Sequence, residues 1–341
     1  MMLVGLFLGL LFVTPFVVTY VVFIRWCDRF EPEPWWLVLC AFVWGAFFAT
    51  IAGGMSSGVV QALVENVTAA AANDPGIEAF GATVLAPVFE EGFKGLGVAI
   101  IAAVSAMGLK ELDGALDGAI YGGVIGLGFT LTEDILYVAQ QFEHEGLGGF
   151  VVLLFLRTVL LGLSHCTFTA CTGLGFGIAA ESRNWFVKIL APIGGYVCAM
   201  AMHAMHNGLP TFFGEEGLVV MILVSWLIDV LFFVMLGVLV VRDRATIIRE
   251  LTSEMGGLLH PRELQLVATY FQLGMRNWSV LFSRGWRAFS VRRRKQLALV
   301  ELAFIKNRRR RGERGRDLDL KEAKLRQEIS WANRQGIWIG S

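Results

Sequence analysis

The chain has 341 residues, of which 55% are hydrophobic and 17% are charged, and its mean hydropathy is +0.61. This composition lies well outside that of an ordinary soluble globular domain and excludes that class. The 29 Lys and Arg residues balance 29 Asp and Glu residues, so the formal net charge is zero. We expect a polytopic membrane protein with an all-α fold, a bundle of membrane-spanning helices.

Seven apolar stretches follow one another along the first 241 residues. A helix needs about 20 residues to cross about 30 Å of hydrocarbon. The predicted spans cover residues 3–24, 35–54, 79–107, 115–139, 148–180, 186–208 and 217–241. No basic residue precedes the first span and no small-residue cleavage site follows it. We therefore expect a retained helix rather than a signal peptide there.

Lys and Arg residues lie on one side of these spans. They follow spans one, three, five and seven, whereas the loops after spans two, four and six hold acidic residues but no Lys or Arg. Basic loop residues are retained on the cytoplasmic side. The sequence therefore predicts a multi-pass protein of the cell (inner or plasma) membrane, with its N-terminus outside and its C-terminus cytoplasmic.

The C-terminal region differs in charge from the rest of the chain. Residues 242–341 hold 22 Lys and Arg against 10 Asp and Glu, which leaves a surplus of 12 positive charges. We predict a transmembrane domain over 1–241 and a basic helical cytoplasmic tail over 242–341. Runs such as SRGWRAFSVRRRK can contact anionic lipid. Nucleic acid is the less favoured acidic partner, and a solvated extension that only enforces orientation is the simplest alternative.

Ionisable side chains cluster in four of the predicted spans, although each costs about 2.5 to 3.5 kcal/mol at the membrane centre. They are Glu90, Glu91 and Lys94 in span three, Glu133 and Asp134 in span four, Arg157 and His165 in span five, and His203 and His206 in span six. The amide of Asn207 lies next to them in span six. Imidazole and carboxylate groups suit zinc, and a catalytic zinc site keeps a position for water beside a carboxylate base. The set fits peptide hydrolysis. Because an H-E-x-x-H motif is absent, the ligands must converge from different helices.

Helical spacing predicts how the third span arranges its charges. Glu90 and Lys94 are four residues apart, so they share a face and can pair, while Glu91 points about 100° away. An ion pair that only fixes helix packing is the simpler explanation of these residues. Arg157 can serve as the counter-ion of a carboxylate elsewhere in the cluster.

The histidines also have simpler explanations. A lone histidine in a membrane helix is more often a hydrogen-bonded contact between helices than a ligand, and we favour that explanation for His206. His165 is different, because Ser164 and Thr169 flank it and can support a ligand through hydrogen bonds.

Four motifs follow one another along these spans. They are EEGFK with Glu90, Glu91 and Lys94, FTLTE with Phe129 and Glu133, HCTFTACTG with His165, and HAMHN with His203 and Asn207. In this order they resemble the motifs of the PrsW family of intramembrane proteases, distant relatives of the CAAX prenyl endopeptidases. The resemblance covers about residues 20–210 and leaves out the basic tail. It implies that 1–241 is a protease domain.

The resemblance also implies catalytic roles. Glu90 is then the general base that activates water, with Glu91 as its partner and Lys94 as the group that positions the pair. Asn207 is then a residue that assists through a ligand contact or donates to the oxyanion of the tetrahedral intermediate.

By the same resemblance, Glu133, His165 and His203 are expected to bind a metal, with Zn²⁺ favoured among divalent ions. Two departures from the family pattern leave the ligand set open. His206 stands where the family often has an aromatic residue and is a competing ligand, and Asp134 replaces an Asn that often follows the second-motif Glu.

The implied substrate is a single-span membrane protein, typically an anti-sigma factor, that is cut at or near its external face. Two other functions stay open at this point. A proton-coupled transporter could relay protons along the buried carboxylates, but it predicts paired repeats with interrupted helices, which the sequence lacks. A non-catalytic scaffold or sensor would use the tail to recruit a partner, and alanine in the cluster would then change stability but no chemistry.

Overall fold

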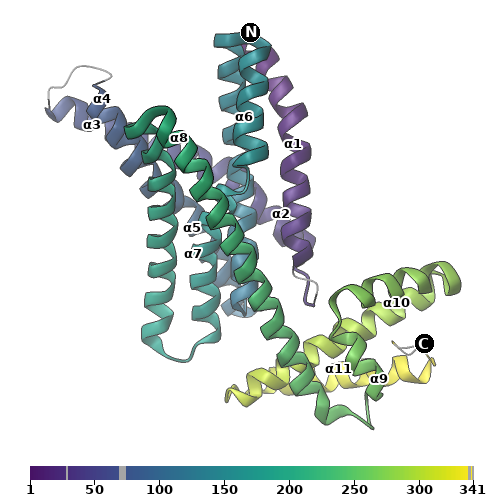
Figure 1. Cartoon of the computed structure of the whole chain (residues 1–341). Coiled ribbons are helices and arrows are strands. Elements are labelled where there is room, and N and C mark those ends of the chain that lie inside the picture. The colour runs from purple at the N-terminus through teal and green to yellow at the C-terminus, as the bar shows by residue number, and fades with distance from the viewer. Residues whose placement is uncertain (28–29, 69–73, 337–338, 340–341) are drawn as a thin grey trace. The chain divides into compact units, whose positions relative to one another are not determined.

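The computed structural model of the chain is all-helical (Figure 1). It describes residues 1–27, 30–68, 74–336 and 339, and these contain no β-strand. Five helical stretches in the described residues are long and apolar enough to cross a membrane, namely Met2–Cys27, Trp35–Thr68, Pro75–Leu109, Ala115–Glu181 and Trp185–Glu254. The prediction of a helical membrane protein is confirmed at this level, while the count of seven spans stays a prediction.

Each of the first three stretches is one helical rod, and the third has a non-helical backbone at Gly108 (φ 145°), one residue before its end. The first is α1 (Met2–Cys27). The second joins α2 (Trp35–Val43), the π-helical η1 (Trp44–Ala49) and α3 (Thr50–Thr68). The third joins α4 (Pro75–Phe80), η2 (Gly81–Leu85), α5 (Ala86–Val104) and η3 (Ser105–Leu109).

The second rod is longer than the predicted span 35–54, because the helix continues through the GGMSSG segment to Thr68. Glycine costs a helix about 1 kcal/mol per residue relative to alanine, too little to end a helix whose backbone bonds are otherwise intact. The predicted external loop over 55–78 is therefore helical up to Thr68, and residues 69–73 within it lie outside the described residues.

The last two stretches each turn back on themselves (Figure 1). They consist of α6 (Ala115–Leu154), η4 (Phe155–Leu160), α7 (Ser164–Glu181) and α8 (Trp185–Leu251). The reversals lie at Gly146 (φ 68°) in α6 and Gly214 (φ 58°) in α8. Both fall between predicted spans. In contrast, the predicted span 148–180 is interrupted between η4 and α7, directly before His165.

Close backbone packing of α6 against α7 fixes the start of α7. A Cβ atom built on Gly126 of α6 would lie 2.2 Å from the carbonyl oxygen of His165, and one on Gly118 would lie 2.1 Å from that of Gly173. Only glycine permits such an approach, and small residues serve this purpose in membrane helix bundles. The glycine-rich runs of the sequence thus hold His165 close to α6.

The chain divides into two compact units, and all predicted site residues belong to the first. The first unit comprises Met1–Asp28 and Glu33–Leu236, and the second comprises Arg29–Pro32 and Gly237–Ser341. The second unit contains η5 (Thr252–Glu254), α9 (Pro261–Val267), α10 (Tyr270–Arg310) and α11 (Arg316–Arg334). It has its own apolar core, which includes Leu264, Leu299, Leu302 and Ile329.

Candidate metal centre

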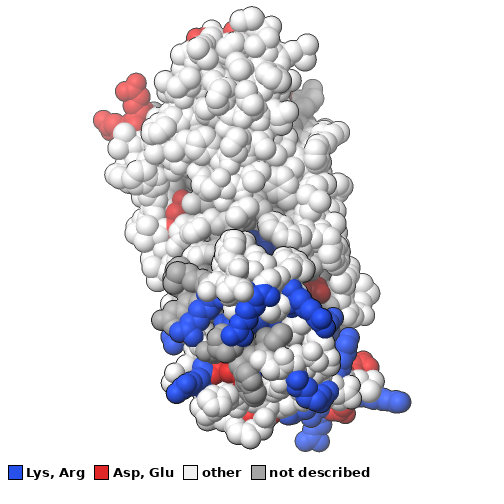
Figure 2. Space-filling view, turned by 90° about the vertical axis from the view of Figure 1, so that its right-hand side faces the viewer, with Lys and Arg blue, Asp and Glu red and all other residues white. Residues whose placement is uncertain are grey.

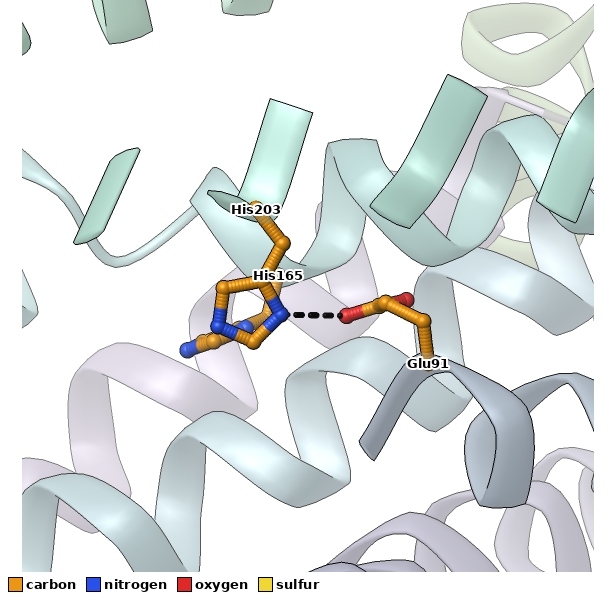
Figure 3. Close-up of side chains that lie close together, drawn as sticks. All are labelled: Glu91, His165 and His203. Carbon is orange, nitrogen blue, oxygen red and sulfur yellow. Dashed lines mark hydrogen bonds and ion pairs between the residues drawn. The ribbon is translucent and has the colours of Figure 1, made fainter. Parts of the chain in front are cut away.

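Three helices bring a carboxylate and two imidazoles together inside the first unit. Glu91 lies on α5, His165 in the first turn of α7 and His203 on α8, and all three side chains are buried. Their ligand atoms lie within 4.8 Å of one another. Figure 3 shows the three side chains converging, with Nδ1 of His203 at 3.0 Å from Oε1 of Glu91. Two imidazoles and a carboxylate are a donor set that suits a first-row divalent metal.

Lys94 lies at the centre of this group and is fully buried. Its Nζ atom donates to Oε1 of Glu91 at 2.8 Å and to Nδ1 of His165 at 3.2 Å. It also lies 3.5 Å from the centroid of the Phe129 ring, a cation–π contact. Oε2 of Glu90, the partner predicted from helical spacing, is farther away at 4.0 Å. Lys94 therefore holds Glu91 more tightly than Glu90.

Glu90 has the least satisfied carboxylate of the group. Its Oε2 atom is buried and accepts no hydrogen bond from the described residues, although Nε2 of His203 lies 3.8 Å away. Buried side-chain oxygens almost always have a partner, and an exception indicates a site for an ion or water, or a catalytic role. Together with the ligand atoms beside it, this oxygen without a hydrogen bond fits a centre that binds a divalent metal and water.

Glu133 joins His165 to a second ionic network. Its Oε2 atom lies 2.8 Å from Nε2 of His165 and accepts from Nη2 of Arg157 at 2.6 Å. Arg157 also donates to Oδ1 of Asp134 at 2.9 Å, and the hydroxyl of Thr158 donates to Oδ2 of the same carboxylate at 2.8 Å. Because Nδ1 of His165 accepts a hydrogen bond from an ammonium group, its Nε2 atom is the donor to Glu133. Carboxylates commonly orient metal-binding histidines in this way.

His206 and Asn207 lie outside the three-residue group. Nδ1 of His206 is 3.2 Å from the hydroxyl of Ser225, and its ring contacts Phe168. The side-chain amide of Asn207 donates to the backbone carbonyl of Ala82 in η2 at 2.9 Å. The structure thus brings together six of the predicted residues and leaves these two beside them; the six are Glu90, Glu91, Lys94, Glu133, His165 and His203.

Two further residues of α7 complete the surroundings of the site. Thr169 was expected to support His165, but its hydroxyl donates to Oε2 of Glu91 at 3.0 Å. Phe168, which sequence reasoning missed, stacks on His203 with ring centroids 5.6 Å apart. Its position three residues after His165 on the same helix face was the available signal.

Comparison with known proteins agrees with this geometry. A family model described as the PrsW family intramembrane metalloprotease matches residues 33–240, a range that contains the whole cluster. Neither the curated proteins nor the solved structures yielded a match. The motif resemblance is therefore confirmed by a match over more than half of the chain. This multi-pass membrane protein belongs to the PrsW family of intramembrane metalloproteases.

Proposed function

We propose that the chain is a zinc-dependent endopeptidase of the cell membrane that cuts a single-span membrane protein, such as an anti-sigma factor. The observation that carries this proposal is the convergence of Glu91, His165 and His203 within 4.8 Å from three helices. The distribution of basic loop residues supports an outside N-terminus and a cytoplasmic C-terminus. In this proposal residues 1–241 are the protease domain, residues 242–341 are a cytoplasmic tail, and cleavage occurs near the external face.

We propose His165, His203 and Glu91 as the residues that hold the metal. The sequence favoured Glu133 as the carboxylate ligand, but Glu133 contacts Nε2 of His165 and the guanidinium of Arg157. Those contacts support a role in which Glu133 orients His165, whose Nδ1 atom faces the group. A divalent metal bound there supplies a Lewis acid that polarises a carbonyl and activates water.

Glu90 is the proposed general base. Its buried Oε2 atom has no hydrogen-bond donor among the described residues and can accept a proton from the attacking water. The water oxygen then bonds to the carbonyl carbon, and the same carboxyl group returns the proton to the leaving nitrogen as the C–N bond breaks. Lys94 balances the charge of Glu91 and keeps that carboxylate in place.

Asn207 is proposed to stabilise the oxyanion. Its amide donates to the carbonyl of Ala82, which fixes the side chain one helical turn beyond His203. An NH₂ group carries two hydrogens, so the amide can donate a second hydrogen bond to a developing negative charge.

Metal content tests this proposal first. Wild type purified in detergent is compared by mass spectrometry with the His165→Ala/His203→Ala double variant and with His144→Ala, an exposed histidine that serves as control. We expect about one zinc per chain in wild type and control, and none in a double variant that elutes as a folded monodisperse protein. A metal-free, monodisperse wild type after zinc loading would favour the transporter or scaffold alternatives.

The choice between the two carboxylates needs a matched pair of variants. Glu91→Gln and Glu133→Gln remove the same charge from the same cluster. If Glu91 is the ligand, its variant loses zinc at concentrations where the Glu133 variant retains most of it. The reverse order would return Glu133 to the ligand set.

A further inference from the structure

An aromatic patch lies on the surface of the second unit. Helix α10 reverses at Gly285 (φ 78°), so its residues form a hairpin of two helices (Figure 1). Around this reversal, Trp278, Phe282 and Trp286 are 59%, 83% and 70% exposed. Phe289 links them, with ring centroids 6.4 Å from Trp278 and 5.4 Å from Trp286. An exposed apolar cluster of this kind marks an interaction surface, because the unit has its own core elsewhere.

Arginines without acidic partners surround the aromatic patch. Arg276, Arg284, Arg287 and Arg293 are exposed, and within the described part of the chain no acidic side chain pairs with them. Several other basic residues of the second unit are paired: Arg294 with Glu328, Arg309 with Asp319, and Lys321 with Glu301. The hairpin therefore presents charge that the rest of the unit does not neutralise.

The pKa of Arg292, inside the hairpin, responds to this charge. Burial lowers the pKa of its guanidinium, and the positive charges of Arg276 and Arg284 lower it further. These two arginines therefore add repulsion to the folded unit rather than stability. Figure 2 shows Lys and Arg side chains gathered over the second unit.

A lipid surface explains both features of the hairpin. Trp and other aromatic side chains prefer the headgroup region of a membrane, and each nearby Lys or Arg gains about 1 kcal/mol from anionic lipid. After its reversal at Gly214, helix α8 continues from an apolar stretch into the second unit, so the unit is tethered to the bilayer. A tethered surface acts at a high effective concentration. We propose that the α10 hairpin, residues 276–294, is an interfacial anchor that inserts Trp278, Phe282 and Trp286 among anionic headgroups.

The test measures lipid contact at the tip of the hairpin in the full-length chain. A fluorescent NBD label is attached at Ser283→Cys, next to Phe282, in a protein whose five native cysteines are replaced. The control label is at Ala323→Cys, an exposed position on α11. The protein is placed in nanodiscs of phosphatidylcholine with or without phosphatidylglycerol, and doxyl-labelled lipid is the quencher.

We expect quenching at position 283 in discs that contain phosphatidylglycerol, little quenching at 323, and loss of the effect in high salt. Arg284→Gln/Arg287→Gln should lower the insertion equilibrium about tenfold or more, because two charges near the headgroups are removed. The matched control Arg314→Gln/Arg316→Gln removes the same charge elsewhere in the unit and should leave quenching unchanged. Trp278→Ala/Phe282→Ala should also reduce it.

Three results would overturn the proposal. Position 283 could be quenched no more than position 323 in every lipid mixture. Quenching could be equal with and without phosphatidylglycerol, which would remove the role of the arginines. A single-stranded oligonucleotide, but not anionic lipid, could change the emission at 283, which would identify the surface as a nucleic-acid site. Cleavage activity is not part of the readout, so the result is independent of the proposed function.

Discussion

Both units of the molecule bury a lysine against a glutamate, but the two pairs differ in how completely they are satisfied. In the second unit, Glu263 accepts from Lys295, from the backbone N–H of Ile339 at 2.9 Å and from that of His260 at 3.0 Å. In the first unit, the pair of Glu91 and Lys94 continues into two imidazoles and into Glu90, whose Oε2 atom accepts nothing from the described residues.

This difference separates a structural role from a chemical one. A buried ion pair adds little net stability over apolar side chains, and it is tolerated when hydrogen bonds satisfy the remaining atoms. The Glu263 pair meets this condition and ties the first turn of α9 to the middle of α10 in the second unit. The cluster of the first unit keeps a carboxylate oxygen of Glu90 without a hydrogen bond, and a metal, a water or a substrate can contact this oxygen.

The largest expected effect comes from Glu90→Gln, which keeps the volume of the side chain and removes the proposed base. Cleavage should fall by about 10² to 10⁴-fold, the usual contribution of a general base. Zinc content should persist, because Glu90 is outside the group of Glu91, His165 and His203. The measurement is cleavage of a co-reconstituted single-span membrane protein, with metal analysis of the same samples.

The matched control is Glu263→Gln, the same substitution in the closed pair of the second unit. It should leave the intrinsic rate of cleavage unchanged. If the Glu90 variant cleaves at the wild-type rate, Glu90 is not the general base. If both variants lose the same cleavage activity, the loss comes from lower stability of the protein and not from removal of a base.

The next effect is on the stability of the second unit. Glu263→Gln removes the negative charge that faces the buried Lys295, and loss of one partner of a buried pair costs about 3 to 5 kcal/mol. Burial already lowers the pKa of Lys295, while Glu263 opposes that shift. Hydrogen exchange of the buried residues Leu299, Val300, Leu302 and Ala303 of α10 in nanodiscs should therefore accelerate more than a hundredfold, since about 1.4 kcal/mol corresponds to a factor of ten.

The double variant Glu263→Gln/Lys295→Met removes both charges of the pair. The N–H groups of His260 and Ile339 donate to different oxygens of Glu263, so the single Gln oxygen accepts from one of them, while Met fills the space of the lysine stem without a charge. We expect part of the lost protection to return. If it does not, the geometry of the pair rather than its charge holds the unit together.

A smaller effect is expected from Arg157, which positions Glu133 and through it His165. Arg157→Gln should weaken zinc binding by about 10- to 100-fold, as loss of such supporting contacts does at metal sites. Because this change also leaves two neighbouring carboxylates unbalanced, Arg157→Gln/Asp134→Asn is the charge-matched variant. It should regain thermal stability but not zinc affinity. Recovery of both would make Arg157 a structural counter-ion only.

The sequence predicted the membrane class and the cluster because the cost of charge in an apolar helix makes such residues conspicuous. It could not predict which glutamate Lys94 holds, because Glu90 and Glu91 are both within helical reach. Contacts from α7 and α8 decide this, through Thr169 and His203 on Glu91. The position of Glu133 likewise depends on Arg157, which is distant in sequence.

Two features of the helices also escaped prediction. The run before His165 stays apolar through the break between η4 and α7 and contains no proline, so hydropathy gave no sign of an interruption. The extension of α3 to Thr68 crosses a polar, glycine-containing segment that favours a loop by composition alone. In the first case close packing of α6 against α7 overrides the local signal, and in the second the cost of glycine is too small to end the helix.

The smallest effect concerns Glu254 of η5, which accepts two hydrogen bonds from Arg326 at 2.8 Å and one from Lys306 at 2.5 Å. These contacts, those of Arg326 first, hold the pKa of Glu254 below its ordinary value of 4.5. The folded unit therefore favours the charged form, so the stabilisation is present above pH 4.5 and is lost as the pH falls toward the lowered pKa.

For such a partly solvated network we expect a contribution of about 1 kcal/mol to the stability of the folded unit. At pH 7, Glu254→Gln should accelerate hydrogen exchange of α11 about fivefold relative to wild type, and the ratio should approach one below the lowered pKa, where wild type is also protonated. Taking the ratio at each pH cancels the intrinsic dependence of exchange on pH. Glu328→Gln, which removes one contact with the exposed Arg294, is the control and should change the ratio little at either pH. If the ratio for the Glu254 variant does not vary with pH, the packing of the Glu254 side chain, and not its charge, stabilises the contact of α11 with η5.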